Sequence, residues 1–226
     1  MNIFTVLFTS AGAVPSYSAN TGYSPEWVDR LVAGIERNSI QRNNFFCLVD
    51  RDDYSFRENV TPILLKDKIE GWSPMMECFR PEICDGTRMV LGLDTIITGS
   101  IEHILEWNDG ECGLLDDPFA KDKLCNGIGI YKQSTINRFW HLWKNRERLF
   151  VNNELYYNGA ISEMAFLRIV AADSHRLNRI FPNEICSYKA HWKVNTKQRQ
   201  DARIVYFHGN PKPPNIEQEL LEHWSV

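Results

Sequence analysis

Two residues with metal-binding side chains stand at the ends of largely apolar segments of this sequence. Asp94 follows residues 88–93, and His208 follows residues 203–207. A carboxylate is a hard oxygen ligand for Mg²⁺ or Mn²⁺, and a neutral imidazole also binds metals. Taken alone, Asp94 is more typical of an aspartate in the turn after a strand, whereas His208 fits a metal ligand and a surface turn equally well.

The segment that starts at His208 also carries groups suited to a phosphate. It reads His-Gly-Asn-Pro-Lys-Pro-Pro, in which Gly209 lets a phosphate approach the backbone and Lys212 supplies a positive charge. The same composition is typical of a proline-rich turn at the surface. These residues are therefore compatible with an anion site and with an ordinary turn.

Other polar side chains lie beside segments that we expect to form strands or helices. Each has an ordinary structural explanation as well, such as a turn, an acid in the first turn of a helix, or a solvated lysine. The candidates retained for binding or catalysis are Thr9, Ser10, Asp50, Arg88, Asn126, Glu163 and Lys189.

Several motifs of nucleotide and hydrolytic chemistry are missing from the sequence. It contains no Gly-x-x-x-x-Gly-Lys-[Ser/Thr] and no Gly-x-Gly-x-x-Gly segment, so a P-loop enzyme or a dinucleotide dehydrogenase has no support. Gly-x-Ser-x-Gly and His-Glu-x-x-His are also missing. The six cysteines include no Cys-x-x-Cys pair, which favours reduced, buried thiols over a zinc site or a disulfide framework.

Composition places the chain among soluble globular proteins. Of its 226 residues, 43% are hydrophobic and 24% are charged. The net charge of -4 argues against a protein that binds nucleic acid mainly through charge. The apolar residues 3–8 follow no Lys or Arg and are too few for a signal peptide, and no other segment approaches the ~20 apolar residues of a membrane helix. We expect a cytoplasmic protein.

The first fifty residues predict the element that would position these side chains. Residues 3–8 are typical of a buried strand, Ser24 and Pro25 of the start of a helix, and residues 45–49 of a second strand. A strand, a helix and a strand in this order predict a parallel sheet with a right-handed crossover. Asp50 then lies at the carboxyl end of the second strand, where open α/β sheets bind ligands.

The alternation of strands and helices continues to the C-terminus, with no repeat or linker, and predicts one domain over residues 1–226. Residues 108–126 are expected to form a loop. The further strands are expected at residues 60–65, 88–93, 127–131, 185–188 and 203–207, with 95–98 extended. The further helices are expected to start at Ser73, at Ser100 (through residue 105) and at Ser134, and to cover residues 162–177 and 216–224.

Taken in order, several segments resemble small glycosyltransferases of the GT-A fold, close to the glycogenin-like group and its short bacterial and phage relatives. The resemblance covers almost the whole chain, and its most specific part is the segment around His208. The segments that carry it are residues 23–31, 45–50, 71–81, 90–99, 126–129, 186–189 and 207–213.

The resemblance implies a single GT-A-like α/β domain with a mostly parallel sheet flanked by helices. It also implies a Mn²⁺ or Mg²⁺ ion, held by Asp94 and His208, that neutralises the diphosphate of a nucleotide-sugar donor. Gly92 replaces the first carboxylate of the family's Asp-x-Asp motif, and Pro74 stands where relatives often have a lysine. The metal therefore has one protein ligand fewer than in the family.

The remaining roles follow from the same resemblance. The expected catalytic residues are Asp94, Asn126 and Glu163, and the expected donor-binding residues are Thr9, Ser10, Asp50, Arg88, Lys189, Gly209 and Lys212. The expected activity is the transfer of a sugar, from a UDP-sugar, to an acceptor hydroxyl on a glycan, a protein, a small molecule or a modified DNA base. Two alternatives stay open: a non-catalytic nucleotide-sugar binder, which Gly92 favours, and a nucleotidyltransferase of the same fold class.

Overall fold

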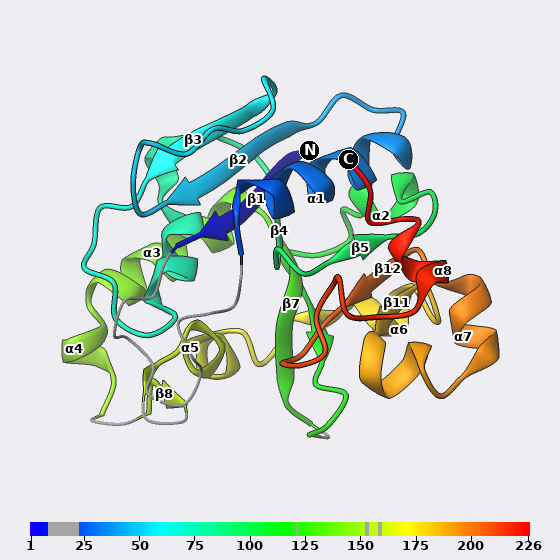
Figure 1. Cartoon of the computed structure of the whole chain (residues 1–226). Coiled ribbons are helices and arrows are strands. Elements are labelled where there is room, and N and C mark those ends of the chain that lie inside the picture. The colour runs from blue at the N-terminus through cyan, green and yellow to red at the C-terminus, as the bar shows by residue number, and fades with distance from the viewer. Residues whose placement is uncertain (9–22, 121, 152–153, 158–159) are drawn as a thin grey trace.

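The computed structural model describes residues 1–8, 23–120, 122–151, 154–157 and 160–226 of the chain (Figure 1). Its centre is a seven-stranded sheet with the order β10-β6-β7-β4-β1-β2-β3. The strands are β1 (Asn2–Leu7), β2 (Asn44–Val49), β3 (Val60–Leu64), β4 (Arg88–Leu91), β6 (Cys112–Asp116), β7 (Leu124–Tyr131) and β10 (His175–Arg176). The strands β3, β2, β1 and β4 are mutually parallel, and β7 runs antiparallel to both β4 and β6.

The predicted strand–helix–strand unit opens the fold. The helix α1 (Pro25–Arg37) begins with a proline at its first turn and connects β1 to β2, which pair in parallel from Asn2↔Asn44 to Leu7↔Val49. Its apolar side chains are buried against the sheet because they recur at helical spacing. This unit and the mostly parallel sheet confirm the predicted α/β fold class.

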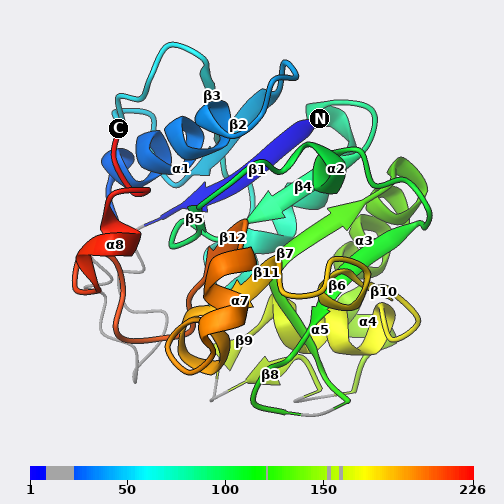
Figure 2. The ribbon, with the colours of Figure 1, turned by 90° about the vertical axis from the view of Figure 1, so that its right-hand side faces the viewer.

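Two hydrophobic cores lie on the two faces of the central sheet. On one face, α1 packs with a three-stranded sheet of order β11-β12-β5, formed by β11 (Ile185–Ser187), β12 (Ile204–Tyr206) and β5 (Ile96–Ile97). On the other face lie the 3₁₀ helix η1 (Ser73–Phe79), α3 (Gln133–Lys144) and α5 (Glu163–Val170). Figure 1 shows α3 and α5 on one side of the central strands, with the small sheet on the other, and Figure 2 shows the small sheet beside β7.

Short elements complete the described chain. They are η2 (Pro81–Ile83), α2 (Glu102–Leu105), α4 (Arg146–Leu149), β8 (Tyr156–Tyr157), β9 (Ala160–Ile161), α6 (Leu177–Ile180), the π-helical turn η3 (Tyr188–Trp192), α7 (Thr196–Asp201) and α8 (Gln218–Leu221). All six cysteines are free thiols, as expected. Among the residues described, no helix combines the length and the apolar character that crossing a membrane requires.

Four element predictions were wrong. The expected loop 108–126 contains β6 and the first residues of β7, because Leu114 and Leu115 are fully buried in the sheet. The helix expected over residues 162–177 ends at Val170, where a turn closed by the Ser174 amide and the Ala171 carbonyl follows. The helix expected at residues 216–224 has one turn, and Ile101 rather than Ser100 is the N-cap of α2.

Candidate functional site

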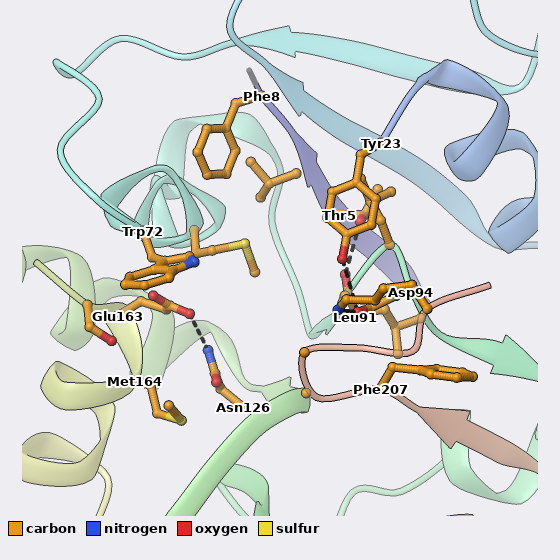
Figure 3. A pocket seen from close by; sticks show the side chains of 18 of the residues that line it. Thr5, Phe8, Tyr23, Trp72, Leu91, Asp94, Asn126, Glu163, Met164 and Phe207 are labelled. Atoms are coloured by element: carbon orange, nitrogen blue, oxygen red, sulfur yellow. Dashed lines mark hydrogen bonds and ion pairs between the residues drawn. The ribbon is translucent and has the colours of Figure 1, made fainter. Parts of the chain in front are cut away.

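A pocket of about 330 Å³ opens at the edge of the sheet where β1 and β4 end (Figure 3). β7 runs in the opposite direction, so its first residues reach the same edge. η1, the start of α5 and the segment after β12 supply the other walls. This is the position at which ligands bind to open α/β sheets.

Asp94, Lys212 and Tyr23 form a polar cluster on one side of the pocket. Asp94 is 8% exposed, and its Oδ2 atom accepts a hydrogen bond of 3.0 Å from the Tyr23 hydroxyl. The Lys212 ammonium forms an ion pair with the same oxygen and lies 5.7 Å from the centre of the Tyr23 ring. Burial lowers the pKa of Lys212 to about 8, which still leaves most of the ammonium charged at neutral pH. The cluster therefore holds a cation at the pocket wall.

The turn after β12 brings Lys212 to this position. Gly209 has a φ of +56°, in the left-handed region that glycine adopts at least cost, and it lines the pocket. Phe207, just before it, lines the pocket as well and stacks on Tyr188 with ring centres 4.6 Å apart. The turn is thus fixed by packing on one side and by the Asp94 ion pair on the other.

Glu163 and Asn126 form a second polar pair, on the other side of the pocket (Figure 3). The Asn126 side-chain amide donates a hydrogen bond of 2.9 Å to Oε1 of Glu163, and Oε2 is buried without a hydrogen-bond partner among the described residues. Burial raises the pKa of Glu163 to about 7. A carboxyl group with this pKa can donate or accept a proton near neutral pH, as general acids and bases must.

Apolar side chains line the space between the two polar groups. They come from the end of β1, from η1 and its preceding turn, and from α5. The larger ones are Phe8, Trp72, Met75 and Met164. Flat aromatic and flexible thioether side chains suit the faces of a nucleobase or a sugar ring.

Gly127 in β7 packs closely against the Tyr206 ring of β12. A Cβ atom on Gly127 would lie 2.7 Å from that ring, so a larger residue would force one of the two to shift. Asn126 and Phe207 are the neighbours of these two residues and both line the pocket. The close contact of Gly127 with Tyr206 therefore lies between the Asn126 and Phe207 parts of the pocket wall.

Of the two predicted metal ligands, Asp94 lines the pocket and His208 is not among its lining residues. The His208 ring contacts the rings of Phe119 and Tyr206, with centres 5.5 and 5.0 Å away, and its Nε2 atom is buried without a partner among the described residues. Burial lowers the pKa of His208, which favours the neutral imidazole. In the described ranges, no three or more His, Cys, Asp or Glu side chains gather in a cluster that could hold a metal ion.

The other predicted residues are distributed inside and outside the pocket. Five of the predicted residues line the pocket: Asp94, Asn126, Glu163, Gly209 and Lys212. Thr9 and Ser10 lie outside the described residues. Asp50 directly follows β2 and is not among the residues that line the pocket. Burial and the negative charge of Asp50 raise the pKa of the neighbouring Tyr54. Lys189 lies in η3, which is not part of the pocket wall.

Arg88 requires a correction. It was expected to bind the donor, but it is fully buried at the start of β4, at the opposite end of the strand from the pocket. Its guanidinium donates hydrogen bonds to the carbonyls of Cys78 (2.7 Å), Arg80 (2.9 Å) and Cys84 (2.6 Å). Because these bonds hold the chain after η1, Arg88 has a structural role.

Tyr23 is the pocket residue of most chemical interest that was not predicted. It directly precedes the Ser24-Pro25 start of α1, and the chain enters that helix from the pocket edge of β1. This position next to a predicted helix start was the available signal. The apolar wall residues carried no such signal, because an apolar side chain near a strand end is more often part of the core.

The sequence matches no protein-family profile and no curated protein. Its fold, however, is similar to solved glycosyltransferase structures. The galactosyltransferase LgtC in complex with donor and acceptor sugar analogues has a TM-score of 0.57 at 11% identity, over 98% of this chain and 91% of that one. The glycosyltransferase GlyE of Streptococcus pneumoniae has a TM-score of 0.68 at 13% identity, over 99% of this chain and 58% of that one.

A third similar structure is that of the bifunctional glycosyltransferase WbbM, with a TM-score of 0.62 at 10% identity over 99% of this chain. The present chain covers 49% of the WbbM chain and 58% of the GlyE chain, so it spans about half the length of these two proteins. At these identities the comparison shows the fold. The fold is the predicted GT-A-like arrangement, with a mostly parallel seven-stranded sheet and helices on both faces.

Proposed function

We propose that this protein transfers a sugar from a nucleotide-diphosphate sugar, of the UDP-sugar class, to an acceptor hydroxyl. One observation carries the proposal. A pocket at the carboxyl ends of β1 and β4 places a half-buried cation, Lys212, opposite a buried carboxyl group with a raised pKa, Glu163. The glycosyltransferase fold supports it.

Lys212 and the Gly209 backbone define the phosphate end of the proposed donor site. Breaking the bond between the sugar and the diphosphate leaves negative charge on the diphosphate oxygen. A fixed positive charge in a partly buried wall stabilises that charge more strongly than water-exposed lysine does. The nucleoside then extends towards Phe8 at the end of β1.

Glu163 and Asn126 define the sugar end. In its ionised form, Oε2 of Glu163 accepts a hydrogen bond from a hydroxyl group of the sugar or of the acceptor. Asn126 holds the carboxyl group by its other oxygen, and Oε2 has no hydrogen-bond partner among the described residues. Sugar hydroxyl groups suit this pair because they donate and accept hydrogen bonds at once.

The alternative function is that of a nucleotide-sugar binder without catalysis, and two observations favour it. Gly92 supplies no carboxylate, and the Asp94 carboxylate is already paired with Lys212. The two functions share the donor site and differ in the fate of the donor. Only the transferase consumes it.

A thermal-shift screen tests the proposal. UDP-, GDP- and TDP-sugars are added to the full chain with and without Mn²⁺, because a ligand of the folded state raises the melting temperature. We expect UDP-sugars to give the largest increase in melting temperature. The variant Glu163→Gln should show the same increase but should no longer consume the donor. Stabilisation without any donor hydrolysis or transfer supports the binder, and no stabilisation by any of the three donors contradicts both functions.

A further inference from the structure

The glycosyltransferase fold raises the question of a divalent cation, and the residues of this pocket do not fit one. Position 92 has no side chain, and Oδ2 of Asp94 is occupied by the Lys212 ammonium and the Tyr23 hydroxyl. His208 is not among the residues that line the pocket, and its ring contacts Phe119 and Tyr206. The position at Oδ2 of Asp94 that a cation would take is held by a lysine.

We propose that Lys212, anchored by Asp94 and Tyr23, is the cation of this site, and that the protein binds the donor diphosphate without a divalent metal. This inference rests on the proposed function. It assigns Asp94 the role of a positioning residue for Lys212, in place of the metal ligation that the sequence suggests.

The geometry supports this role for Lys212. An ammonium group has three N–H donors, of which the Asp94 carboxylate takes one. The other two are available to the oxygens of a diphosphate. Because the Lys212 side chain is 20% exposed, it meets the pocket with a small open surface while most of it is shielded from water. Shielding strengthens its attraction to a phosphate.

Tyr23 and Asp94 also reduce the freedom of the lysine. A solvated lysine loses the entropy of its long side chain when it binds a phosphate. Here the side chain is already held by the ion pair and lies near the Tyr23 ring, at 5.7 Å from its centre. The positive charge is therefore in place before the donor arrives, which lowers the cost of binding.

The test is a calorimetric titration of the full chain with UDP, uridine and inorganic pyrophosphate, in EDTA and then in Mn²⁺. We expect UDP and pyrophosphate to bind in EDTA, with affinities that Mn²⁺ changes by less than about threefold. Lys212→Met should weaken both by about tenfold or more, which corresponds to one charge-assisted hydrogen bond, and should leave uridine binding unchanged. Lys197→Met, at an exposed position of α7 outside the pocket wall, is the matched control and should change nothing.

Two further variants distinguish the loss of the Lys212 charge from an effect of the substitution on folding. Lys212→Met leaves the buried Asp94 carboxylate unpaired, so the double variant Lys212→Met/Asp94→Asn removes that charge as well and should lose diphosphate binding to the same extent. Lys212→Arg keeps a positive charge and should retain part of the affinity. A folded double variant with unchanged affinity for pyrophosphate would overturn the inference.

The outcomes for the two proposals are distinct. If UDP and pyrophosphate bind only when Mn²⁺ is present, and Asp94→Asn abolishes that binding, the metal-free site is wrong while the donor site stands. If neither UDP nor uridine binds under either condition, the proposed function fails as well. If both bind in EDTA and depend on Lys212, both proposals stand.

Discussion

The Asn126 amide joins β7 to the first turn of α5 by donating a 2.9 Å hydrogen bond to Oε1 of Glu163. The two residues are 37 positions apart in the sequence, yet both line the same pocket. The bond favours the ionised form of Glu163, while burial opposes it more strongly. The balance of these two effects places the pKa of Glu163 near neutral pH.

Protein stability should therefore depend on the protonation of Glu163. Burial raises its pKa from 4.5 to about 7, so the folded protein binds this proton more tightly than the unfolded chain does. The stabilisation is fully present below pH 4.5 and is lost as the pH rises through about 7. Each pKa unit corresponds to about 1.4 kcal/mol, which gives a loss of about 3 kcal/mol.

Urea unfolding of the wild type and of Glu163→Gln, at about pH 5 and about pH 8, measures this effect. The neutral amide keeps the shape and cannot ionise, so the variant should lose less stability between the two pH values than the wild type. Equal losses in both proteins would show that Glu163 does not titrate in this range.

Asn126→Ala should shift the pH profile of donor consumption to higher pH. The substitution removes the hydrogen bond that favours the carboxylate, so the pKa of Glu163 rises further. The measurement is the rate of donor hydrolysis or transfer across the pH range for both proteins. If the midpoint of the pH profile stayed the same and only the maximal rate changed, Asn126 would act on the substrate and would not affect the pKa of Glu163.

Gly127→Ala should destabilise the protein by roughly 1–3 kcal/mol, because its methyl group would lie 2.7 Å from the Tyr206 ring. The control is Gly34→Ala in α1, where the added Cβ would meet Ile97 at an ordinary 3.5 Å. Alanine is the better helix former, so this control should be neutral or stabilising by up to about 1 kcal/mol. Thermal unfolding of the two variants decides between these outcomes.

Arg88→Met should lower stability by about 3 kcal/mol or more, since it leaves buried carbonyls of Cys78, Arg80 and Cys84 without their donor. The affinity of the folded fraction for UDP should not change, because Arg88 lies outside the pocket. Arg148→Met, on the exposed side of α4, is the control for loss of an arginine. If the variant bound UDP more weakly and its stability were unchanged, Arg88 would be a donor-binding residue as the sequence predicted.

Local sequence predicted the parts of this fold that depend on local patterns. The strand–helix–strand unit followed from the apolar residues 3–8 and 45–49 and from the Ser24-Pro25 helix start, and the structure contains it. The strand β6 was missed because Gly113 and the acidic residues around it are typical of a loop, although the sheet buries Leu114 and Leu115 completely. Burial by distant strands overrides such a local signal.

The site was less accessible to prediction because its central contact is not local. Asp94 and Lys212 are 118 positions apart, and their pairing depends on the path of the chain after β12. The sequence shows a carboxylate and a lysine, each with several possible partners. Which of them meet is decided by how the segment after β12 folds against the end of β4, and local sequence does not encode that.

The reversed direction of β7 has a consequence for how this protein can diverge. Asn126 is the third residue of β7, close to the hairpin that connects β6 to it, whereas Asp94 follows the end of β4. Hairpins tolerate insertions and substitutions better than sheet strands do. Changes in this hairpin can reach the Asn126 side of the pocket through β7, and the Lys212 side through the contact of Phe119 with His208. A single substitution in the hairpin can therefore alter both polar sides of the pocket at once.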